Sequence, residues 1–189
     1  MNERVVVVNA SKMNYDHLLD FSVLSNDVQV YDDSTNAELI ERIQGAAVVV
    51  TKEIPVGAEL LSQFPESVKL IVEAGTGYNN IDLDAARAKG ITVCNIPAYS
   101  TERVAHTAVM MLLNFASTMQ QQIGMLAKGD RTNFTKHLQV PHTEVNGKTL
   151  GIIGAGHIGM AVVKVAKALD MNVLIHTRTP KEDSDGIRY

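Results

Sequence analysis

The chain has 189 residues, of which 46% are hydrophobic and 20% are charged, the composition of an ordinary globular protein. Its formal net charge of −4 gives no electrostatic reason to expect nucleic acid or an anionic membrane as a partner. The single cysteine, Cys94, excludes an internal disulfide framework and fits a reducing compartment. No apolar run is long enough for a signal peptide or a bilayer span, so we expect a cytoplasmic location and no membrane partner.

Short, continuous apolar runs predict the strands of the N-terminal half. Such runs are typical of strands that helices cover on both faces of a parallel sheet. Two helices are predicted between them: one has Thr35 and Glu38 at the spacing of a capping box, and the other begins at Asp82. This alternation predicts one open α/β domain over residues 1–99. The five runs are Val5–Val8, Val28–Tyr31, Ala46–Val50, Val68–Val72 and Ile91–Cys94.

A long apolar helix is predicted next, over residues 100–122, with Ser100 or Thr101 as its cap. Residues 108–119 are apolar on more than one side, which is typical of a helix that is buried nearly all round. We expect one face to pack on a sheet and the other to meet a second copy of the chain, giving a homodimer through helix 100–122. The polar stretch 124–145 is expected to be a long irregular loop.

The stretch GIIGAGHIGM holds the pattern G-x-G-x-x-G at Gly154, Gly156 and Gly159. The pattern alone is a weak signal. Here an apolar strand is predicted before it, an amphipathic helix after it, and a second strand ending at His176. That context is typical of a dinucleotide-binding βαβ unit. An ordinary strand–turn–helix with convenient glycines is the alternative.

Each glycine of such a unit has a separate task. The first permits the tight turn out of the strand, the second lets the backbone approach the pyrophosphate, and the third allows close packing of the helix. The backbone N–H groups of His157 and Ile158 would then point at the phosphates, helped by the helix dipole. We therefore predict that the three glycines and these two residues bind the cofactor.

The end of the second strand, at Thr177 and Arg178, carries no carboxylate. An NAD site usually has Asp or Glu there, accepting from the ribose 2′-hydroxyl. A hydroxyl beside a guanidinium would instead attract a 2′-phosphate. We therefore predict an NAD(P) site that prefers NADP and includes both residues; the alternative is that Arg178 is only a solvated surface residue.

Two segments resemble the D-isomer-specific 2-hydroxyacid dehydrogenases, in particular their branch of hydroxypyruvate/glyoxylate reductases and glycerate dehydrogenases. They are residues 73–105, EAGTGYNNIDLDAARAKGITVCNIPAYSTERVA, and residues 147–180, GKTLGIIGAGHIGMAVVKVAKALDMNVLIHTRTP. The resemblance implies a flavodoxin-like substrate domain over residues 1–99 and the first half of a Rossmann NAD(P)-binding domain over residues 100–189. It also implies hydride transfer between NAD(P)H and a small 2-oxo or 2-hydroxy acid such as hydroxypyruvate or glyoxylate.

The resemblance gives a role to a second glycine-rich loop. The backbone N–H groups of Gly75, Thr76 and Gly77 would bind the substrate carboxylate. Two glycines after a buried strand can expose consecutive amides to an anion, although an ordinary strand-end turn is the alternative. Lys52, after the third predicted strand, could add positive charge at the same edge of the sheet. An exposed lysine is the simpler interpretation, so Lys52 is not included in the predicted site.

The catalytic arginine, glutamate and histidine of the family all follow the second strand of its cofactor domain. The sequence has no counterpart of them before Tyr189, so no catalytic residue and no metal site is assigned. We expect the chain to be the N-terminal portion of a longer enzyme and to be inactive alone. Two alternatives are open: a non-catalytic module that binds a dinucleotide or a protein, and a phosphoglycerate or formate dehydrogenase on the same fold.

Overall fold

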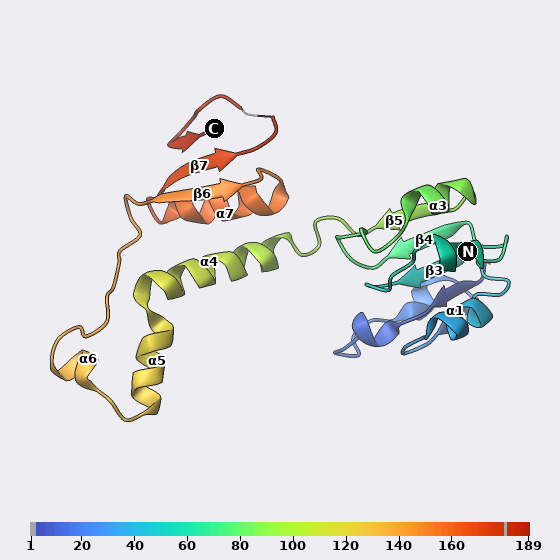
Figure 1. Cartoon of the computed structure of the whole chain (residues 1–189), viewed down its shortest axis with the longest axis horizontal. Coiled ribbons are helices and arrows are strands. Elements are labelled where there is room, and N and C mark those ends of the chain that lie inside the picture. Colours follow the sequence, from blue (N-terminus) through green and yellow to red (C-terminus); the bar gives the residue numbers. More distant parts are fainter. Residues whose placement is uncertain (1–2, 180) are drawn as a thin grey trace. The chain divides into compact units, whose positions relative to one another are not determined.

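The computed structural model describes residues 3–179 and 181–189. It divides the chain into two compact units, Met1–Pro97 and Ala98–Tyr189 (Figure 1). Both units combine helices with a parallel sheet, so the α/β fold class predicted from the sequence is confirmed. In the part of the chain that the structure describes, no helix is both long and apolar enough to cross a membrane.

The first unit contains a five-stranded parallel sheet in the order β2-β1-β3-β4-β5. This is the strand order of flavodoxin-like folds, in which the chain reverses its direction of winding between β1 and β3. The five apolar runs of the sequence all form strands. They are β1 (Val5–Val7), β2 (Val28–Val30), β3 (Val48–Thr51), β4 (Leu70–Glu73) and β5 (Thr92–Asn95).

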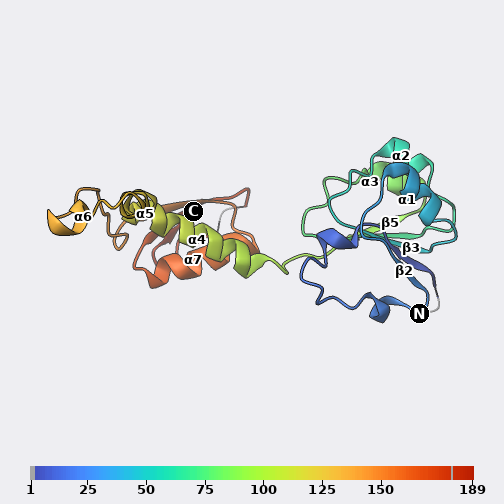
Figure 2. The same cartoon turned by 90° about the horizontal axis from the view of Figure 1, so that it is seen from below.

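Three helices lie on one face of this sheet (Figure 2), and their apolar side chains pack with those of β1, β3 and β4 in one cluster. The opposite face packs on two short 3-10 helices, η1 (Ala10–Lys12) and η2 (Phe21–Leu24). The edge strands β2 and β5 are partly exposed, so burial on both faces holds only for the inner strands. The three helices are α1 (Asn36–Arg42), α2 (Ala58–Ser62) and α3 (Leu83–Ala88).

The predicted helix caps of this unit are present. The Thr35 N–H donates to Glu38 Oε2 at 2.8 Å, and the Glu38 N–H donates back to Thr35 Oγ1 at 3.3 Å. Asp82 begins α3 by accepting from the Ala85 N–H at 3.0 Å. The short helix α2 was not predicted, because five residues give too little periodicity to detect.

The second unit contains a three-stranded parallel sheet in the order β6-β7-β8. Helix α7 packs on one face through Val163 and Ala166, against Val173 and other residues of β6 and β7. The opposite face is open, and the side chain of Ile153 is 91% exposed there. The strands are β6 (Thr149–Ile153), β7 (Asn172–His176) and β8 (Ile187–Arg188), and α7 spans His157–Ala168.

The prediction of one continuous helix over residues 100–122 is wrong. The helix ends at Ser117, and a second helix starts at Met119, because Thr118 has the left-handed backbone angles φ 50° and ψ 35°. The Ser117 and Asn114 side chains donate to carbonyls one turn back, which weakens the continuation of the helix. The Thr118 hydroxyl in turn donates to the carbonyls of Ser117 and Pro141. The two helices are α4 (Thr101–Ser117) and α5 (Met119–Ala127).

Two further expectations for this region need correction. Helix α4 packs against α7 rather than directly on a sheet, and its Leu112 joins the core cluster of this unit. The stretch 124–145 is not one irregular loop, since α5 continues to Ala127 and a short helix, α6, spans Thr132–Thr135. Apolar residues of α5 spaced three to four apart continue the helical pattern past residue 122, but the prediction placed the start of the loop at Gly124.

Candidate functional site

The glycine turn joins the end of β6 to the start of α7. Gly154 has a φ of +99°, a value that residues with a β-carbon rarely adopt. Its N–H donates to the His176 carbonyl at 2.8 Å, and Ile153 pairs with His176 in the sheet. The last residue of β7 therefore lies beside the turn, so Thr177 and Arg178 follow at the same edge of the sheet.

Gly159 allows the first turn of α7 to lie against the backbone of the glycine turn. A β-carbon at this position would be 2.1 Å from the Gly154 carbonyl oxygen, well inside any real contact, and 3.5 Å from Ile152 Cγ2. Only glycine fits without a shift of the backbone. The absence of a side chain at Gly159 thus mainly allows the helix to approach the glycine turn. The motif predicts close packing of the helix on the sheet, and this contact is less tight.

Gly156 is the N-cap residue directly before α7, and no side-chain hydrogen bond caps the helix there. The first N–H groups of a helix have no acceptor inside the helix, so those of His157 and Ile158 are left for an external acceptor. A β-carbon at Gly156 would meet no atom within 4 Å, so no neighbouring group crowds this position beside the start of the helix. The arrangement provides backbone donors and the positive end of a helix dipole in an accessible position.

The residues that follow β7 are accessible to different degrees. Arg178 is exposed and Thr177 is half-buried, and no carboxylate occurs from His176 to Thr179. Thr177 and Arg178 therefore lie at the same sheet edge as the five residues of the glycine turn and helix start. Pro180 lies outside the described residues.

The second glycine-rich loop leaves the end of β4 in the first unit. Its carbonyls are held from the neighbouring strand: the Ile96 N–H donates to the Gly75 carbonyl at 2.9 Å, and Asn95 Nδ2 donates to the Thr76 carbonyl at 2.8 Å. Among the residues that the structure describes, the N–H groups of Gly75 and Gly77 have no acceptor. With the carbonyls held and two amides left over, the loop can offer hydrogen-bond donors to an anion.

A buried carboxylate that was not predicted from the sequence lies next to this loop. Glu73 is 1% exposed, and both of its oxygens are hydrogen-bonded. Its Oε1 accepts from the Glu53 N–H at 3.0 Å, and its Oε2 accepts from Asn80 Nδ2 at 2.9 Å. Asn80 Nδ2 also donates to the Ile54 carbonyl at 2.8 Å. Glu73 therefore ties the loop after β3 to the loop after β4.

Lys52 also lies at this loop, although the sequence analysis left it out of the site. Its Nζ donates to the Ala74 carbonyl at 3.2 Å, and its side chain is 17% exposed. The ammonium is 3.9 Å from Glu53 Oε1. The only available sequence signal was its place directly after a buried strand, at the same edge of the sheet as the loop.

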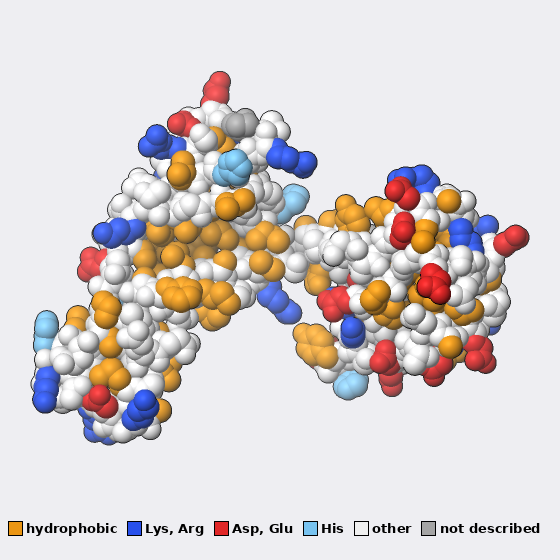
Figure 3. Space-filling view, in the orientation of Figure 1, with side chains coloured by type: hydrophobic (Ala, Val, Ile, Leu, Met, Phe, Trp, Pro, Cys, Tyr) orange, Lys and Arg blue, Asp and Glu red, His pale blue; other side chains and the backbone are white. Residues whose placement is uncertain are grey.

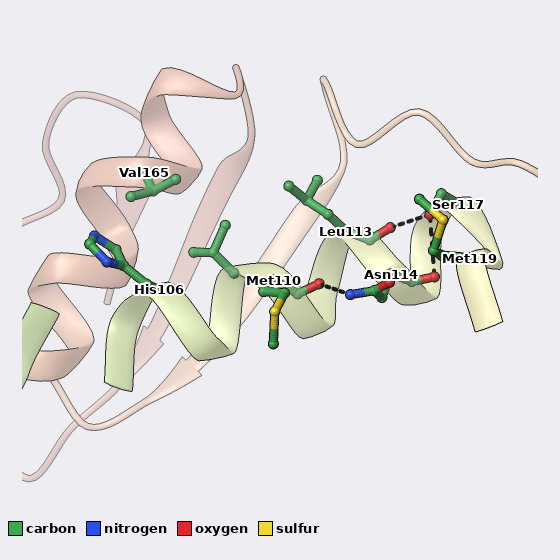
Figure 4. Close-up of a pocket in the computed structure, with 8 residues that line it drawn as sticks. His106, Met110, Leu113, Asn114, Ser117, Met119 and Val165 are labelled. Carbon is green, nitrogen blue, oxygen red and sulfur yellow. Dashed lines mark hydrogen bonds between the residues drawn. The ribbon is translucent and has the colours of Figure 1, made fainter. Parts of the chain in front are cut away.

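An apolar groove of about 430 Å³ runs along α4 in the second unit, and His106, Met110, Leu113 and Val165 are among its lining residues (Figure 4). His106 Nε2 is 3.7 Å from Glu102 Oε2, and the two side chains are 70% and 77% exposed. This histidine–carboxylate pair is a solvated contact between successive turns of a helix, so no catalytic role is assigned to it.

Known proteins match this chain along most of its length. The family model for the D-isomer specific 2-hydroxyacid dehydrogenase catalytic domain matches residues 5–177. The chain belongs to this family. A hydroxypyruvate reductase from Blautia hydrogenotrophica is 34% identical over 156 residues, which are 80% of this chain and 48% of the relative. A D-3-phosphoglycerate dehydrogenase from Methanocaldococcus jannaschii is 38% identical over 150 residues, 78% of this chain and 28% of the relative.

Solved structures of dehydrogenases and reductases have the same fold as this chain. D-lactate dehydrogenase from Aquifex aeolicus, complexed with NAD and lactic acid, has a TM-score of 0.81 at 27% identity and covers 95% of this chain. A glyoxylate reductase from Paecilomyes thermophila has a TM-score of 0.81 at 25% identity and covers all of this chain. The matches include 53% and 60% of those two chains. This chain thus spans about half, or less, of the length of the curated relatives named above.

Proposed function

We propose that this chain is the substrate-binding and coenzyme-binding part of an NAD(P)-dependent oxidoreductase that acts on small 2-oxo and 2-hydroxy acids, with hydroxypyruvate and glyoxylate as the preferred substrates. One observation carries the proposal. The start of α7 is open, has no side-chain cap, and is fitted to the glycine turn so closely that Gly159 tolerates no β-carbon. The named hydroxypyruvate reductase and glyoxylate reductase relatives support the choice of substrate.

Each of the two glycine-rich segments is proposed to bind a different ligand. A bound nicotinamide would supply the hydride. The N–H groups of His157 and Ile158 hold the coenzyme's pyrophosphate, and Gly156 leaves room for it. The N–H groups of Gly75, Thr76 and Gly77 hold the substrate's carboxylate. No residue of this chain is assigned to the transfer of the hydroxyl proton.

The coenzyme is proposed to be NADP rather than NAD. The support is the half-buried hydroxyl of Thr177 and the exposed guanidinium of Arg178 at the strand end beside the glycine turn. A 2′-phosphate gains charge-assisted hydrogen bonds from such a pair, and residues 176–179 include no carboxylate that would repel it.

Helices α4 and α5 are proposed to form the interface of a homodimer. No Asp, Glu, Lys or Arg occurs over residues 104–127. Hydrophobic side chains gather over this region (Figure 3), and Phe115 is 82% exposed, Met110 55% and Ile123 52%. A large exposed apolar patch is typical of an interaction surface. In light scattering we expect twice the chain mass for the wild type, and the single-chain mass for Phe115→Glu but not for Leu18→Glu, an 82% exposed site in the first unit.

The coenzyme proposal is tested by calorimetric titration of the full chain with NADPH and NADH. We expect NADPH to bind more tightly, and Gly156→Val to abolish binding because the added side chain fills the space in front of the helix. Gly57→Val is the matched control. Gly57 begins α2 with φ −78° and ψ 175°, close to the −77° and −169° of Gly156, and its β-carbon would also meet nothing within 4 Å. Unaltered NADPH binding by Gly156→Val would contradict the proposal.

A phosphoglycerate dehydrogenase is the second candidate function, because the Methanocaldococcus jannaschii relative reaches 38% identity. The same calorimetric titration discriminates the two candidates when hydroxypyruvate and 3-phosphoglycerate are compared as ligands. Tighter binding of 3-phosphoglycerate would favour this second function.

A further inference from the structure

The loop proposed to bind the substrate carboxylate stands over a buried negative charge. A β-carbon at Gly75 would be 3.2 Å from Glu73 Oε1. Glu73 is held as a hydrogen-bond acceptor at both oxygens and cannot turn away without losing its bonds to Glu53 and Asn80. At such short range in a partly buried site, this carboxylate would repel a second one placed on the loop.

Lys52 supplies the opposite charge at the same place. The position that a β-carbon of Gly75 would take is 3.6 Å from Lys52 Nζ, so the ammonium and the Glu73 carboxylate lie on the same side of this glycine. The Lys52 side chain is mostly buried, which reduces the screening of its charge by solvent. The ammonium therefore offsets part of the repulsion that an anion would meet from Glu73 and from the more exposed Glu53, whose Oε1 is 3.9 Å from Lys52 Nζ.

The backbone of Lys52 is fixed from the neighbouring strand. Asn9 follows β1 and is 0% exposed. Its Nδ2 donates to the Lys52 carbonyl at 2.6 Å, and its Oδ1 accepts from the Lys52 N–H at 3.0 Å. Both hydrogen-bonding groups of the Lys52 backbone are thereby satisfied by one buried amide. The two bonds of the Asn9 side chain connect the end of β1 to the end of β3. In sheets of this strand order, ligands bind at the carboxyl ends of these two strands.

We propose that the Lys52 ammonium binds the carboxylate of the ligand together with the loop amides, and that it makes the site selective for 2-oxo acids over neutral ketones of the same shape. This inference rests on the proposed function, since it adds a residue to the proposed substrate site. Gly75 and Gly77 alone offer dipoles, which also attract a neutral carbonyl. The net charge of Lys52 is the element that distinguishes a carboxylate from a methyl group.

The test uses the full chain labelled with ¹⁵N and follows the amide signals of Gly75 and Gly77 by NMR. The two ligands are hydroxypyruvate and hydroxyacetone, which replaces the carboxylate by a methyl group. We expect the wild type to bind hydroxypyruvate at least tenfold more tightly than hydroxyacetone. Lys52→Met should weaken the binding of hydroxypyruvate by about tenfold or more and leave that of hydroxyacetone unchanged. Lys52→Arg should keep most of the preference.

Lys69→Met is the matched control for the lost charge. Lys69 is an exposed lysine directly before β4, at the opposite end of the strand that leads into the loop. The affinities of Lys69→Met for both ligands should therefore equal those of the wild type. The amide spectrum of each variant shows whether it is folded, and Lys52→Gln replaces Lys52→Met if the latter is not. If the wild type binds hydroxypyruvate and both Lys52→Met and Lys52→Arg bind it with unchanged affinity, the role of Lys52 would be overturned, while the proposed carboxylate site would stand. No change of the Gly75 and Gly77 signals in the wild type would overturn the proposed carboxylate site itself.

Discussion

Helices α1 and α7 differ in how their N-termini are closed. The N-terminus of α1 is satisfied by its own side chains, through the reciprocal bonds of Thr35 and Glu38. That of α7 begins at Gly156 and has no side-chain cap. An α-helix gains stability from a cap, so an uncapped start in front of open space forgoes that gain. This difference is what we expect if the start of α7 is kept open for an anionic ligand.

The two glycine-rich segments differ in the same way. The turn of the second unit takes its shape from its glycines, through the positive φ of Gly154 and the close approach at Gly159, and from the backbone bond of the Gly154 N–H to the His176 carbonyl. The loop of the first unit is held by side chains, namely those of Glu73, Asn80 and Asn95. The glycine turn depends on the absence of side chains, so adding one should disrupt it. The loop after β4 depends on side chains that form hydrogen bonds, so removing one should disrupt it.

The largest effect is expected for Gly159→Ala. The added β-carbon would be 2.1 Å from the Gly154 carbonyl oxygen, so α7 must move away from the turn. We expect the second unit to lose about 3 kcal/mol or more of its unfolding free energy, measured by hydrogen exchange of the α7 amides. The first unit should keep its protection.

Gly124→Ala is the control for this substitution. Gly124 lies within α5, and a β-carbon there would meet nothing within 4 Å. Alanine in place of glycine inside a helix should stabilise it by about 0.5–1 kcal/mol. If Gly159→Ala behaved like Gly124→Ala, the described fit between helix and turn would be wrong.

The next largest effect is expected for Glu73→Ala, which acts on the first unit. The substitution leaves the Glu53 N–H and one bond of the Asn80 amide without an acceptor in a buried place. We expect a loss of about 2–4 kcal/mol, again by hydrogen exchange, and faster exchange in the loop after β4. Glu66→Ala changes an exposed carboxylate of the same unit and should alter stability by less than about 0.5 kcal/mol.

The features that could be predicted from the sequence are those that depend on local residue patterns, and the features that could not are those that depend on contacts between distant residues. The glycine turn was predicted residue by residue, because a missing side chain directly specifies backbone shape. The parallel sheet was predicted from its apolar runs, since these identify buried strands without knowledge of their partners. The role of Glu73 could not be predicted, and Lys52 could be considered only as a positive charge at this edge of the sheet. The contacts that fix them are non-local, since Asn9 is 43 residues from Lys52 in sequence and Glu53 is 20 from Glu73. The break at Thr118 depends on a bond to Pro141, which is equally non-local.

A smaller effect is expected for Thr177→Asp, which tests the ligand proposed for the open helix. A carboxylate at this strand end would accept from a ribose 2′-hydroxyl and repel a 2′-phosphate. We expect the ratio of NADPH affinity to NADH affinity to fall by about tenfold, which corresponds to about 1.4 kcal/mol, in a calorimetric titration. Thr179→Asp adds the same charge two residues further on and should change the ratio less. An unchanged ratio in Thr177→Asp would contradict the proposed preference for NADP.

The smallest effect is expected at the cap of α1. Thr35→Ala removes the hydroxyl that accepts from the Glu38 N–H and should lower stability by about 1 kcal/mol, measured by hydrogen exchange of α1. The effect also depends on pH. The Thr35 backbone N–H, and then its hydroxyl, hold the pKa of Glu38 below its ordinary value of 4.5. A carboxyl group whose pKa is lowered by folding stabilises the fold above its ordinary pKa, and this contribution disappears as the pH falls through the lowered value.

We therefore expect the wild type to lose its advantage over Glu38→Gln as the pH falls from 6 to below 4. In Thr35→Ala the pKa of Glu38, followed by NMR, should rise part of the way to its ordinary value, because the backbone donor remains. Helix α7 has no such group at its start, so the protection of its amides should show no matching change over this pH range. Equal acid sensitivity of the two helix starts would mean that α7 is closed by a carboxylate after all, and the case for an open anion site would fail with it.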